Sequence, residues 1–243
     1  MKNPDLPHVL INMAMTADGK IATANRTLSS FGSARDHAHL LELRATADAV
    51  MAGARTVDLN PINLGPGPAR YRRRRIKNGL AEYNLRVVVS GSGSLNPRAA
   101  LFKQRFSPII VFTSQRASKA RLKRLAALAN EVKVCGVREI NFRGVLAWLR
   151  RKWNVQRLLC EGGGELNSAL FAAGLVDELH LTVCPNIFGG RRAPTIADGL
   201  GATTLAKATH LQLKSSRRVG DELFLVYHAV PKGRTKLRAA SRH

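Results

Sequence analysis

Cysteine, aromatic residues and acidic residues are all scarce in this chain of 243 residues. It has three cysteines, 5% aromatic residues, and 16 Asp and Glu against 39 Lys and Arg. Three cysteines spread through apolar segments argue against a disulfide-built scaffold or a zinc site and favour a reducing, cytoplasmic compartment. The shortage of aromatic side chains argues against a surface on which single-stranded nucleic acid stacks.

Long apolar runs are also missing. No stretch approaches the ~20 apolar residues of a membrane-spanning helix, and the first residues lack the basic-then-apolar order of a secretion signal. We therefore expect no membrane partner and no targeting segment. The apolar fraction of 45% is nevertheless too high for a disordered basic protein. A chain of this length buries roughly 70% of its unfolded surface, so we expect a substantial core.

The excess of basic residues gives a net charge of +23 and is concentrated in three segments. Six of the eight residues 70–77 are basic, as are five of the nine residues 116–124, and five more cations follow residue 231. Such runs bind nucleic acid by neutralising phosphates, but they are equally typical of a solvated basic surface. We expect no specific nucleic-acid partner.

Apolar runs and amphipathic segments alternate through the middle of the chain. Runs rich in Val and Ile predict strands, and Ser33 is a good N-cap for the helix that follows it. The predicted strands are residues 8–15, 47–53, 85–90, 108–113, 132–135, 155–160 and 178–184. The predicted helices are residues 34–46, 116–130, 145–153 and 166–173. The Pro- and Gly-rich, then Arg-rich segment 60–78 is interpreted as a loop.

This alternation predicts an α/β fold with a mainly parallel central sheet flanked by helices. Residues 210–218 and 222–230 flank a V-G-D turn and predict a C-terminal antiparallel hairpin. The sequence shows no repeat and no linker. We therefore expect residues 1–231 to form one domain, followed by a basic tail, residues 232–243, that we expect to be disordered.

Ligands of a parallel sheet bind beyond the carboxyl ends of its strands, so the loops that follow the predicted strands are the places to search. They read D-G-K from Asp18, G-A-R-T from Gly53, S-G-S-G from Ser90 and E-G-G-G from Glu161. Glycines at a helix N-terminus let backbone N–H groups approach a phosphate, and the helix dipole favours an anion. E-G-G-G-E-L is the best dinucleotide candidate, although most glycine-rich turns are only turns.

Motifs of covalent and metal catalysis are missing. The sequence has no G-x-S-x-G, H-E-x-x-H or C-x-x-C. Among the seven histidines only His37 and His39 are closely spaced, and they would point to different sides of a helix. The cysteines fit inert core positions. We expect no metal, and the residues favour a noncovalent phosphate- or nucleotide-binding enzyme over a hydrolase.

Five segments occur in an order and at a spacing that resembles a known family. They are N-M-A-M-T-A-D-G-K-I-A, L-R-A-T-A-D-A-V-M-A-G-A-R-T-V, E-G-G-G-E-L-N, G-L-V-D-E-L and P-N-I-F-G-G-R-R-A-P-T. Over residues 8–230 the chain resembles the pyrimidine reductases of riboflavin biosynthesis, which have the dihydrofolate-reductase-like fold. Asn12 and the last segment are closer to the stand-alone form, and the zinc motifs of the family's deaminase domain are absent from the sequence.

The resemblance implies an NADPH-dependent oxidoreductase. Its substrate would be a 5-amino-6-ribosylamino-pyrimidine 5′-phosphate, in the 2,5-diamino-4-oxo or the dioxo form, and its product the ribitylamino compound. The ribosylamine opens to an imine, and the nicotinamide delivers a hydride to the former anomeric carbon. Family members are commonly homodimers, so we expect a homodimer.

The resemblance also implies roles for individual residues. Glu161 matches a substrate-contacting acid able to assist proton transfer; Asp18 is able to do the same, or only caps its turn. Arg44 matches a substrate contact, and its alternative is an arginine on the helix surface. The implied cofactor contacts are Ala14, Thr56, Asn60, Ser90, Gly91, Ser92, Gly162, Gly163, Gly164 and Glu165. The implied substrate contacts are Asn12, Ser33, Arg44, Leu64, Arg70 and Glu161.

One turn departs from the family pattern. T-V-D-L-N-P, residues 56–61, is one residue shorter than usual and has Asn60 before the proline in place of an acidic pair. This change keeps open a dihydrofolate or dihydropterin reductase on the same scaffold. The basic runs keep open a nucleic-acid-binding protein with a reductase-like fold. Arg116 is a candidate partner for the 2′-phosphate that distinguishes NADPH from NADH.

Overall fold

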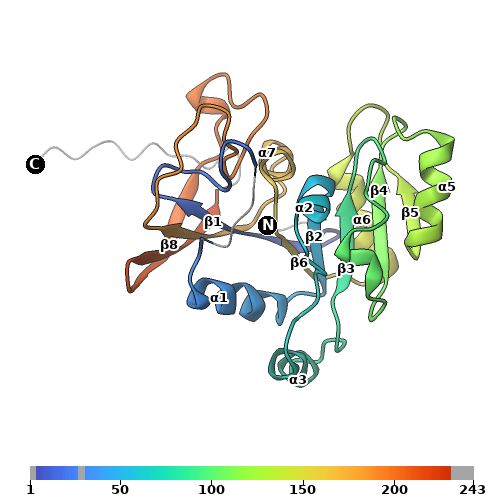
Figure 1. The fold of residues 1–243 in the computed structure, drawn as a ribbon, viewed down its shortest axis with the longest axis horizontal. Coiled ribbons are helices and arrows are strands. Elements are labelled where there is room, and N and C mark those ends of the chain that lie inside the picture. Colours follow the sequence, from blue (N-terminus) through green and yellow to red (C-terminus); the bar gives the residue numbers. More distant parts are fainter. Residues whose placement is uncertain (1–3, 27–30, 231–243) are drawn as a thin grey trace, which may run out of the picture.

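One sheet of nine strands organises the molecule. The computed structural model describes residues 4–26 and 31–230, so the expected tail, residues 232–243, lies outside the described residues. The strand order is β5-β4-β3-β2-β6-β1-β7-β9-β8. Figure 1 shows the sheet running across the molecule, with helices on both of its faces.

Seven of these strands are parallel and follow the apolar runs of the sequence. They are β1 (His8–Thr16), β2 (Ala49–Gly53), β3 (Leu85–Val89), β4 (Ile109–Thr113), β5 (Glu131–Val134), β6 (Arg157–Cys160) and β7 (Glu178–Cys184). β8 (Leu211–Val219) and β9 (Glu222–Ala229) form an antiparallel hairpin, and β9 pairs with β7. The predicted fold class, with its antiparallel C-terminal edge, is confirmed.

The predicted helices are present with slightly different ends. They are α1 (Ala34–Arg44), α5 (Lys119–Leu128), α6 (Phe142–Trp153) and α7 (Gly164–Ala172). α1 begins at Ser33, whose hydroxyl accepts hydrogen bonds from the N–H groups of Arg35 and Asp36, as its N-cap role requires. α6 ends at Asn154 in the left-handed conformation typical of helix C-termini.

Three further helices were not predicted: α2 (Ala54–Leu59), α3 (Ala69–Lys77) and α4 (Ala100–Lys103). The interpretation of residues 60–78 as one loop is therefore wrong for residues 69–77. Arginine is a good helix former, and Pro68 stands at the N-cap of α3, where its missing N–H costs nothing. Arg72 pairs with Glu82 at 3.0 Å, which offsets part of the repulsion between the arginines.

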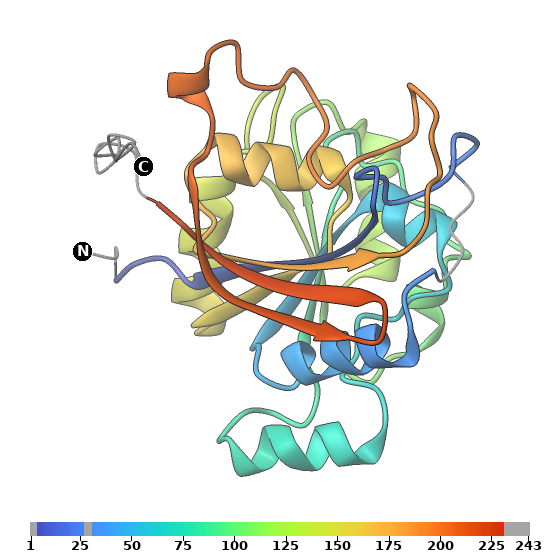
Figure 2. The same cartoon turned by 90° about the vertical axis from the view of Figure 1, so that its left-hand side faces the viewer.

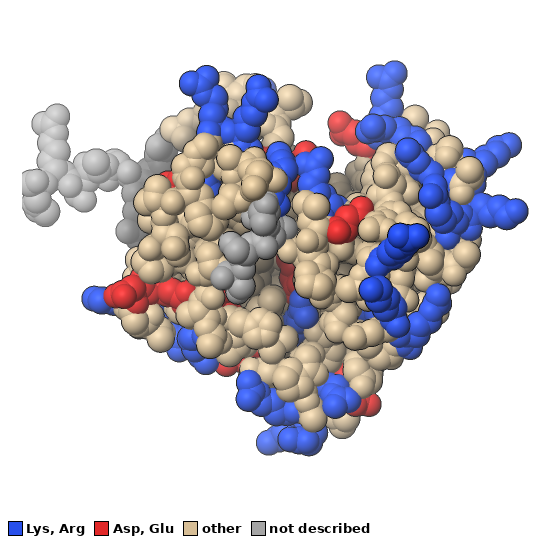
Figure 3. Space-filling view, viewed as in Figure 1, with Lys and Arg blue, Asp and Glu red and all other residues tan. Residues whose placement is uncertain are grey.

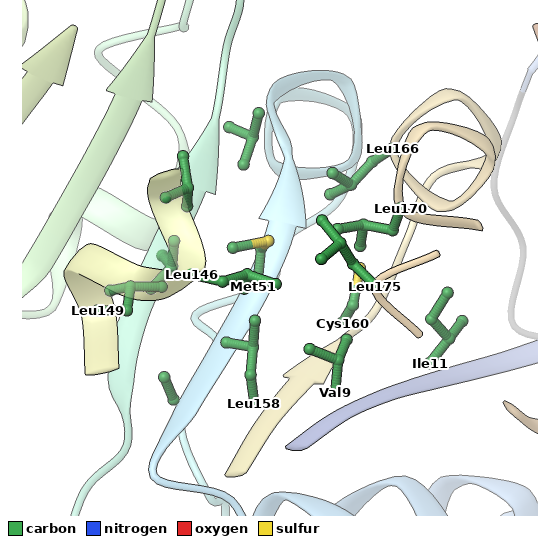
Figure 4. Close-up of a cluster of buried hydrophobic side chains, with 14 of the residues drawn as sticks. Val9, Ile11, Met51, Leu146, Leu149, Leu158, Cys160, Leu166, Leu170 and Leu175 are labelled. Atoms are coloured by element: carbon green, nitrogen blue, oxygen red, sulfur yellow. The ribbon is translucent and has the colours of Figure 1, made fainter. Parts of the chain in front are cut away.

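Two apolar layers hold the helices on the sheet. α6 and α7 pack on one face through Leu146, Leu149, Leu166 and Leu170 against β1, β2 and β6, as Figure 4 shows. α1, α2, α4 and α5 cover the opposite face. Among the described residues, no helix is long and apolar enough to cross a membrane.

α3 lies outside these layers. Tyr71 packs with Leu41 and Ala45 of the α1 region, and all three are buried. In Figure 2, α1 lies between the sheet and α3, which forms the outermost element on that side. The arginine-rich segment is therefore a helix docked on α1.

Candidate active site

The candidate site lies at the carboxyl ends of β2 and β6. These neighbouring parallel strands lead in opposite directions across the sheet, because β2 continues to β3 and β6 continues through α7 to β7. Such a switch point leaves a crevice in which α/β proteins bind ligands. Figure 3 shows the molecule hollowed between its two halves, in a surface where basic side chains are spread widely.

The glycine-rich loop after β6 occupies this point. Gly163 is the N-cap of α7, and none of the described side chains caps that helix. The N–H of Gly53, at the end of β2, donates to Gly162 O at 2.8 Å. The Gly162–Gly163 peptide bond is cis. The loop thus leaves the backbone N–H groups of the first turn of α7 available for an anion.

Two of these glycines differ in the space around them. A Cβ on Gly164 would lie 2.5 Å from the carbonyl oxygen of Thr195, so this position requires glycine. A Cβ on Gly163 would meet only the Thr56 hydroxyl, at 3.5 Å. The space beside Gly163 and Thr56 is therefore open, and the structure brings these two predicted cofactor residues together. Glu165 follows in the first turn of α7.

A buried ion pair closes the other side of the loop. Nε and Nη2 of Arg44 donate to the two carboxylate oxygens of Glu161, each at 2.6 Å, and Nη1 donates to Gly65 O at 2.7 Å. Only 8% of the Arg44 side chain and 9% of the Glu161 side chain are exposed. The alternative of Arg44 as a helix-surface residue is therefore wrong. Two of its five N–H donors remain for a ligand.

Asn12 lies between this ion pair and β7. It is one residue beyond the last paired position of β1 with β6, beside Glu161, and it is the register partner of His180 on β7. Both side chains are buried, and Asn12 Oδ1 and His180 Nδ1 find no hydrogen-bond partner among the described residues. Burial is the main cause that lowers the pKa of His180, against its hydrogen bond to Glu178. Ala14, two residues along β1, is half-buried.

The remaining predicted cofactor residues follow β2 and β3, with Asn60 at the far end of α2 and Ser90, Gly91 and Ser92 directly after β3. Asn60 ends α2, and its side-chain amide donates to Thr56 O at 2.7 Å. Ser90 is 4% exposed and its hydroxyl donates to Ser94 O. Gly91 O accepts from Ser114, and Ser92 O accepts from Arg121. These groups line the same edge of the sheet as the glycine loop.

Ser33 lies near a separate cavity of about 330 Å³, lined also by Phe31, Pro185 and Glu222. Its N–H and hydroxyl both donate to the Glu222 carboxylate. Asp36, in the first turn of α1, has its pKa raised by burial, which Glu222 reinforces. The cap of α1 thus contacts buried Glu222, near which lies the half-buried Asp36.

Asp18 follows β1 and holds the loop after β7. Its carboxylate accepts from the Thr16 hydroxyl and from the N–H groups of Phe188 and Gly189, the latter at 2.7 Å. The hydrogen bond from Thr16 is the largest cause that lowers the pKa of Asp18. These contacts support the alternative role for Asp18, that of holding its turn in place.

The side chains of Leu64 and Arg70, both predicted substrate contacts, do not lie at the edge of the sheet that carries the glycine loop. Leu64 is fully buried in the apolar layer under α1. Arg70 is on α3, with its guanidinium over the Tyr71 ring, and Figures 1 and 2 place α3 on the opposite side of the molecule from α7. Arg116 follows β4, and its backbone N–H donates to the Ser114 hydroxyl.

Three residues outside the predicted cofactor and substrate contacts also shape the site. The Gly53 N–H donates to Gly162 O, the Asp198 N–H donates to Gly164 O, and the fully buried Asn167 donates to Ile196 O. Gly53 and Asn167 lie in segments that carry the family resemblance, whereas nothing in the sequence marked Asp198. Burial raises the pKa of Cys160 to about 12, as an inert core thiol requires. The described residues contain no group of three or more His, Cys, Asp or Glu that would hold a metal.

A glycine-rich loop at the switch point of a mainly parallel sheet is typical of α/β proteins that bind a ligand there. The RibD C-terminal domain family matches residues 7–225. The chain therefore belongs to that family, as its motifs predicted. Its named relatives are reductases of riboflavin biosynthesis, so the chain is an oxidoreductase.

Two relatives show the extent of the similarity. The chain is 35% identical over 221 residues to a Methanothermobacter thermautotrophicus protein named 2,5-diamino-6-ribosylamino-4(3H)-pyrimidinone 5′-phosphate reductase, covering 91% of this chain and 97% of that one. A protein of the same name from Archaeoglobus fulgidus is 34% identical over 193 residues, or 79% and 87% of the two chains.

Solved structures share the fold. A pyrimidine reductase-like protein from Corynebacterium diphtheriae superposes with a TM-score of 0.77 at 23% identity, covering 92% of each chain. The riboflavin biosynthesis reductase of Saccharomyces cerevisiae superposes with a TM-score of 0.67 at 14% identity, covering 95% of this chain and 93% of that one.

Proposed function

We propose that this protein uses NADPH to reduce the ribosylamino group of a 5-amino-6-ribosylamino-pyrimidine 5′-phosphate to the ribitylamino group. The 2,5-diamino-4-oxo form is the first substrate to test, because it is the one that the names of the two relatives specify. The observation that carries the proposal is the buried Arg44–Glu161 pair beside the uncapped, glycine-rich N-terminus of α7.

The chain's residues fit a dinucleotide. Backbone N–H groups of Gly163, Gly164 and Glu165 would hold the pyrophosphate, since the helix dipole favours an anion there. A Cβ on Gly163 would meet no atom but the Thr56 hydroxyl, so the space beside this glycine leaves room for that group. Ser90, Gly91 and Ser92 extend this edge toward the adenosine side, and Ala14 would meet the nicotinamide. When bound, NADPH supplies the hydride.

The residues beside this cradle would hold the substrate. When the ribosylamine opens, its nitrogen gives up a proton and the ring oxygen gains one; reduction then adds a hydride to the former anomeric carbon and a proton to nitrogen. The Glu161 carboxylate keeps lone pairs beyond those that Arg44 uses, so it is able to accept N–H or O–H donors and assist these transfers. Asn12 adds a buried acceptor on the neighbouring strand.

Arg44 and Asp18 support this arrangement. Arg44 fixes both oxygens of Glu161 and offers its two remaining N–H donors to an anionic substrate. Asp18 is an ionised acceptor with a lowered pKa, so it holds the loop at residues 188–189. We therefore assign proton transfer to Glu161 alone.

A homodimer and a reducing, cytoplasmic compartment complete the proposal. Exposed Leu213 and Leu223 on the edge hairpin support association, and the three cysteines are free, which supports a reducing compartment. Sedimentation would measure the mass against 26.5 kDa for one chain. A monomer at assay concentration would contradict the dimer.

The test of the proposal is turnover. Purified protein is mixed with NADPH or NADH and, in parallel, with the diamino-oxo pyrimidine phosphate, the dioxo form or dihydrofolate. We expect oxidation of NADPH with a pyrimidine phosphate. Turnover of dihydrofolate alone would instead support the pterin reductase alternative, and no turnover with any of the three would contradict both.

A further inference from the structure

The arginine-rich helix α3 lies away from the candidate active site, and its role is not explained by that site alone. Arg75 is only 1% exposed, and it shares with Arg86 the place of the largest almost fully buried side chain among the described residues. It lies on α3, and its neighbours Arg73, Arg74 and Lys77 on the same helix are exposed. One arginine of this run therefore differs in environment from the cations around it.

Arg75 binds the end of α1. Its Nη1 donates to Arg44 O at 2.7 Å and to Ala47 O at 2.6 Å, and its Nε donates to Ala81 O. Burial lowers the pKa of Arg75 to about 10, so it remains a cation at neutral pH. A cation on the last carbonyls of a helix also matches the negative end of the helix dipole.

Asn84 binds the same two atoms. It is fully buried, and its side-chain amide donates to Arg44 O at 2.8 Å and to Ala47 O at 2.7 Å. The carbonyl oxygens of Arg44 and Ala47 thus accept four hydrogen bonds from the side chains of Arg75 and Asn84. These bonds fix the backbone at the end of α1 and in the turn that follows it.

The residue held in this way is the one that pairs with Glu161. The backbone of Arg44 is held by Arg75 and Asn84, and its side chain is held by Gly65 O, from the loop that leads into α3. Tyr71 adds apolar contact with Leu41, one turn earlier in α1. Residues 61–84 therefore hold Arg44 by both its backbone and its guanidinium.

We propose that residues 61–84 form a clamp that sets the position of the Arg44–Glu161 pair, with Arg75 and Asn84 as its positioning residues. The clamp rests on the proposed function, because it acts on the carboxylate that the reductase site uses. The clamp also gives a role to the arginine-rich helix α3, which lies far from the proposed cofactor site. The side chains of Arg75 and Asn84 donate to backbone carbonyls and not to the Arg44–Glu161 pair itself, so we assign them a positioning role.

Kinetics of matched variants test the clamp. Arg75→Met and Asn84→Ala remove donors to the two carbonyls, and Arg74→Gln removes an exposed charge from the same helix as a control. We expect kcat to fall about 10–100-fold in the first two, since a shift of about 1 Å at a reacting group costs this much. The KM for NADPH should be unchanged, Arg75→Lys should recover part of kcat, and Arg74→Gln should match the wild type.

Hydrogen exchange gives a readout that needs no substrate. Peptides covering residues 40–48 and 157–166 should exchange faster in Asn84→Ala than in Arg74→Gln, because loosening α1 also loosens Glu161. If the wild type turns over no pyrimidine, the proposed function fails while this comparison still decides the clamp. Wild-type kcat and exchange in both Arg75→Met and Asn84→Ala would overturn it. The clamp would also be overturned if kcat fell only in proportion to thermal stability, if NADPH binding were lost in parallel, and if Arg75→Lys recovered no activity.

Discussion

Breaking the Arg44–Glu161 pair should cost the protein much of its stability. Arg44→Met leaves the Glu161 carboxylate with only 9% of its side chain exposed and without its partner. Removing one partner of a buried pair costs about 3–5 kcal/mol, and the donor lost by Gly65 O adds about 1 kcal/mol. The sum of about 4–6 kcal/mol is comparable with the whole stability of a marginal domain.

The thermal midpoint measures this cost. For a chain of this size, each kcal/mol corresponds to a shift of about 2–4 °C, so Arg44→Met should melt about 8–24 °C below the wild type. Urea unfolding should give the same loss with an unchanged slope against denaturant. The double variant Arg44→Met, Glu161→Leu should recover most of the loss, because replacing both partners by apolar groups is close to neutral.

A small effect would refute the reasoning. A loss below about 1 kcal/mol in Arg44→Met is the behaviour of a solvent-exposed pair. It would mean that water reaches Glu161 and that the pair is not the buried centre of the site. Additive losses in the double variant would likewise show that the two side chains do not interact.

Three further predictions concern the glycines and the titrating groups. Gly163→Ala should fold normally but bind NADPH at least about tenfold more weakly by fluorescence titration, since the added methyl fills the space left for the pyrophosphate; unchanged affinity would move the pyrophosphate elsewhere. Gly164→Ala should instead lower the thermal midpoint, because its Cβ meets Thr195 O at 2.5 Å; normal stability would contradict this contact. Burial keeps the pKa of His180 below its usual 6.5, so the stability it contributes is present above pH 6.5 and lost as the pH falls through its folded pKa. His180→Gln should therefore flatten the fall of the thermal midpoint below pH 6.5, and an unchanged pH profile would show that His180 is not the group involved.

The strands were predictable because a parallel sheet buries both faces. Its strands then read as continuous runs of Val and Ile, such as β3 and β4, which the sequence shows directly. The V-G-D turn likewise marked the hairpin of β8 and β9. α3 was missed because six cations in eight residues hide any apolar face, and its stabilising contacts come from distant carbonyls at Arg44 and Ala47.

The candidate site was predictable in its loops and not in its pairings. Strand ends and glycines located the loop at Glu161, because topology alone places such loops at one edge. That Arg44 would turn inward onto Glu161 is a contact across 117 positions, and nothing local in L-R-A specifies it. The sequence suggested two roles for Asp18, and only its bonds to Phe188 and Gly189 favour one of them.

Comparing Glu161→Gln with the wild type tests the central claim most directly. The measurement is NADPH oxidation with the 2,5-diamino-4-oxo pyrimidine phosphate, with NADPH affinity determined separately. The account predicts turnover by the wild type, a loss of roughly a hundredfold or more in kcat for Glu161→Gln, and unchanged NADPH affinity. Wild-type turnover by a correctly folded Glu161→Gln would contradict it.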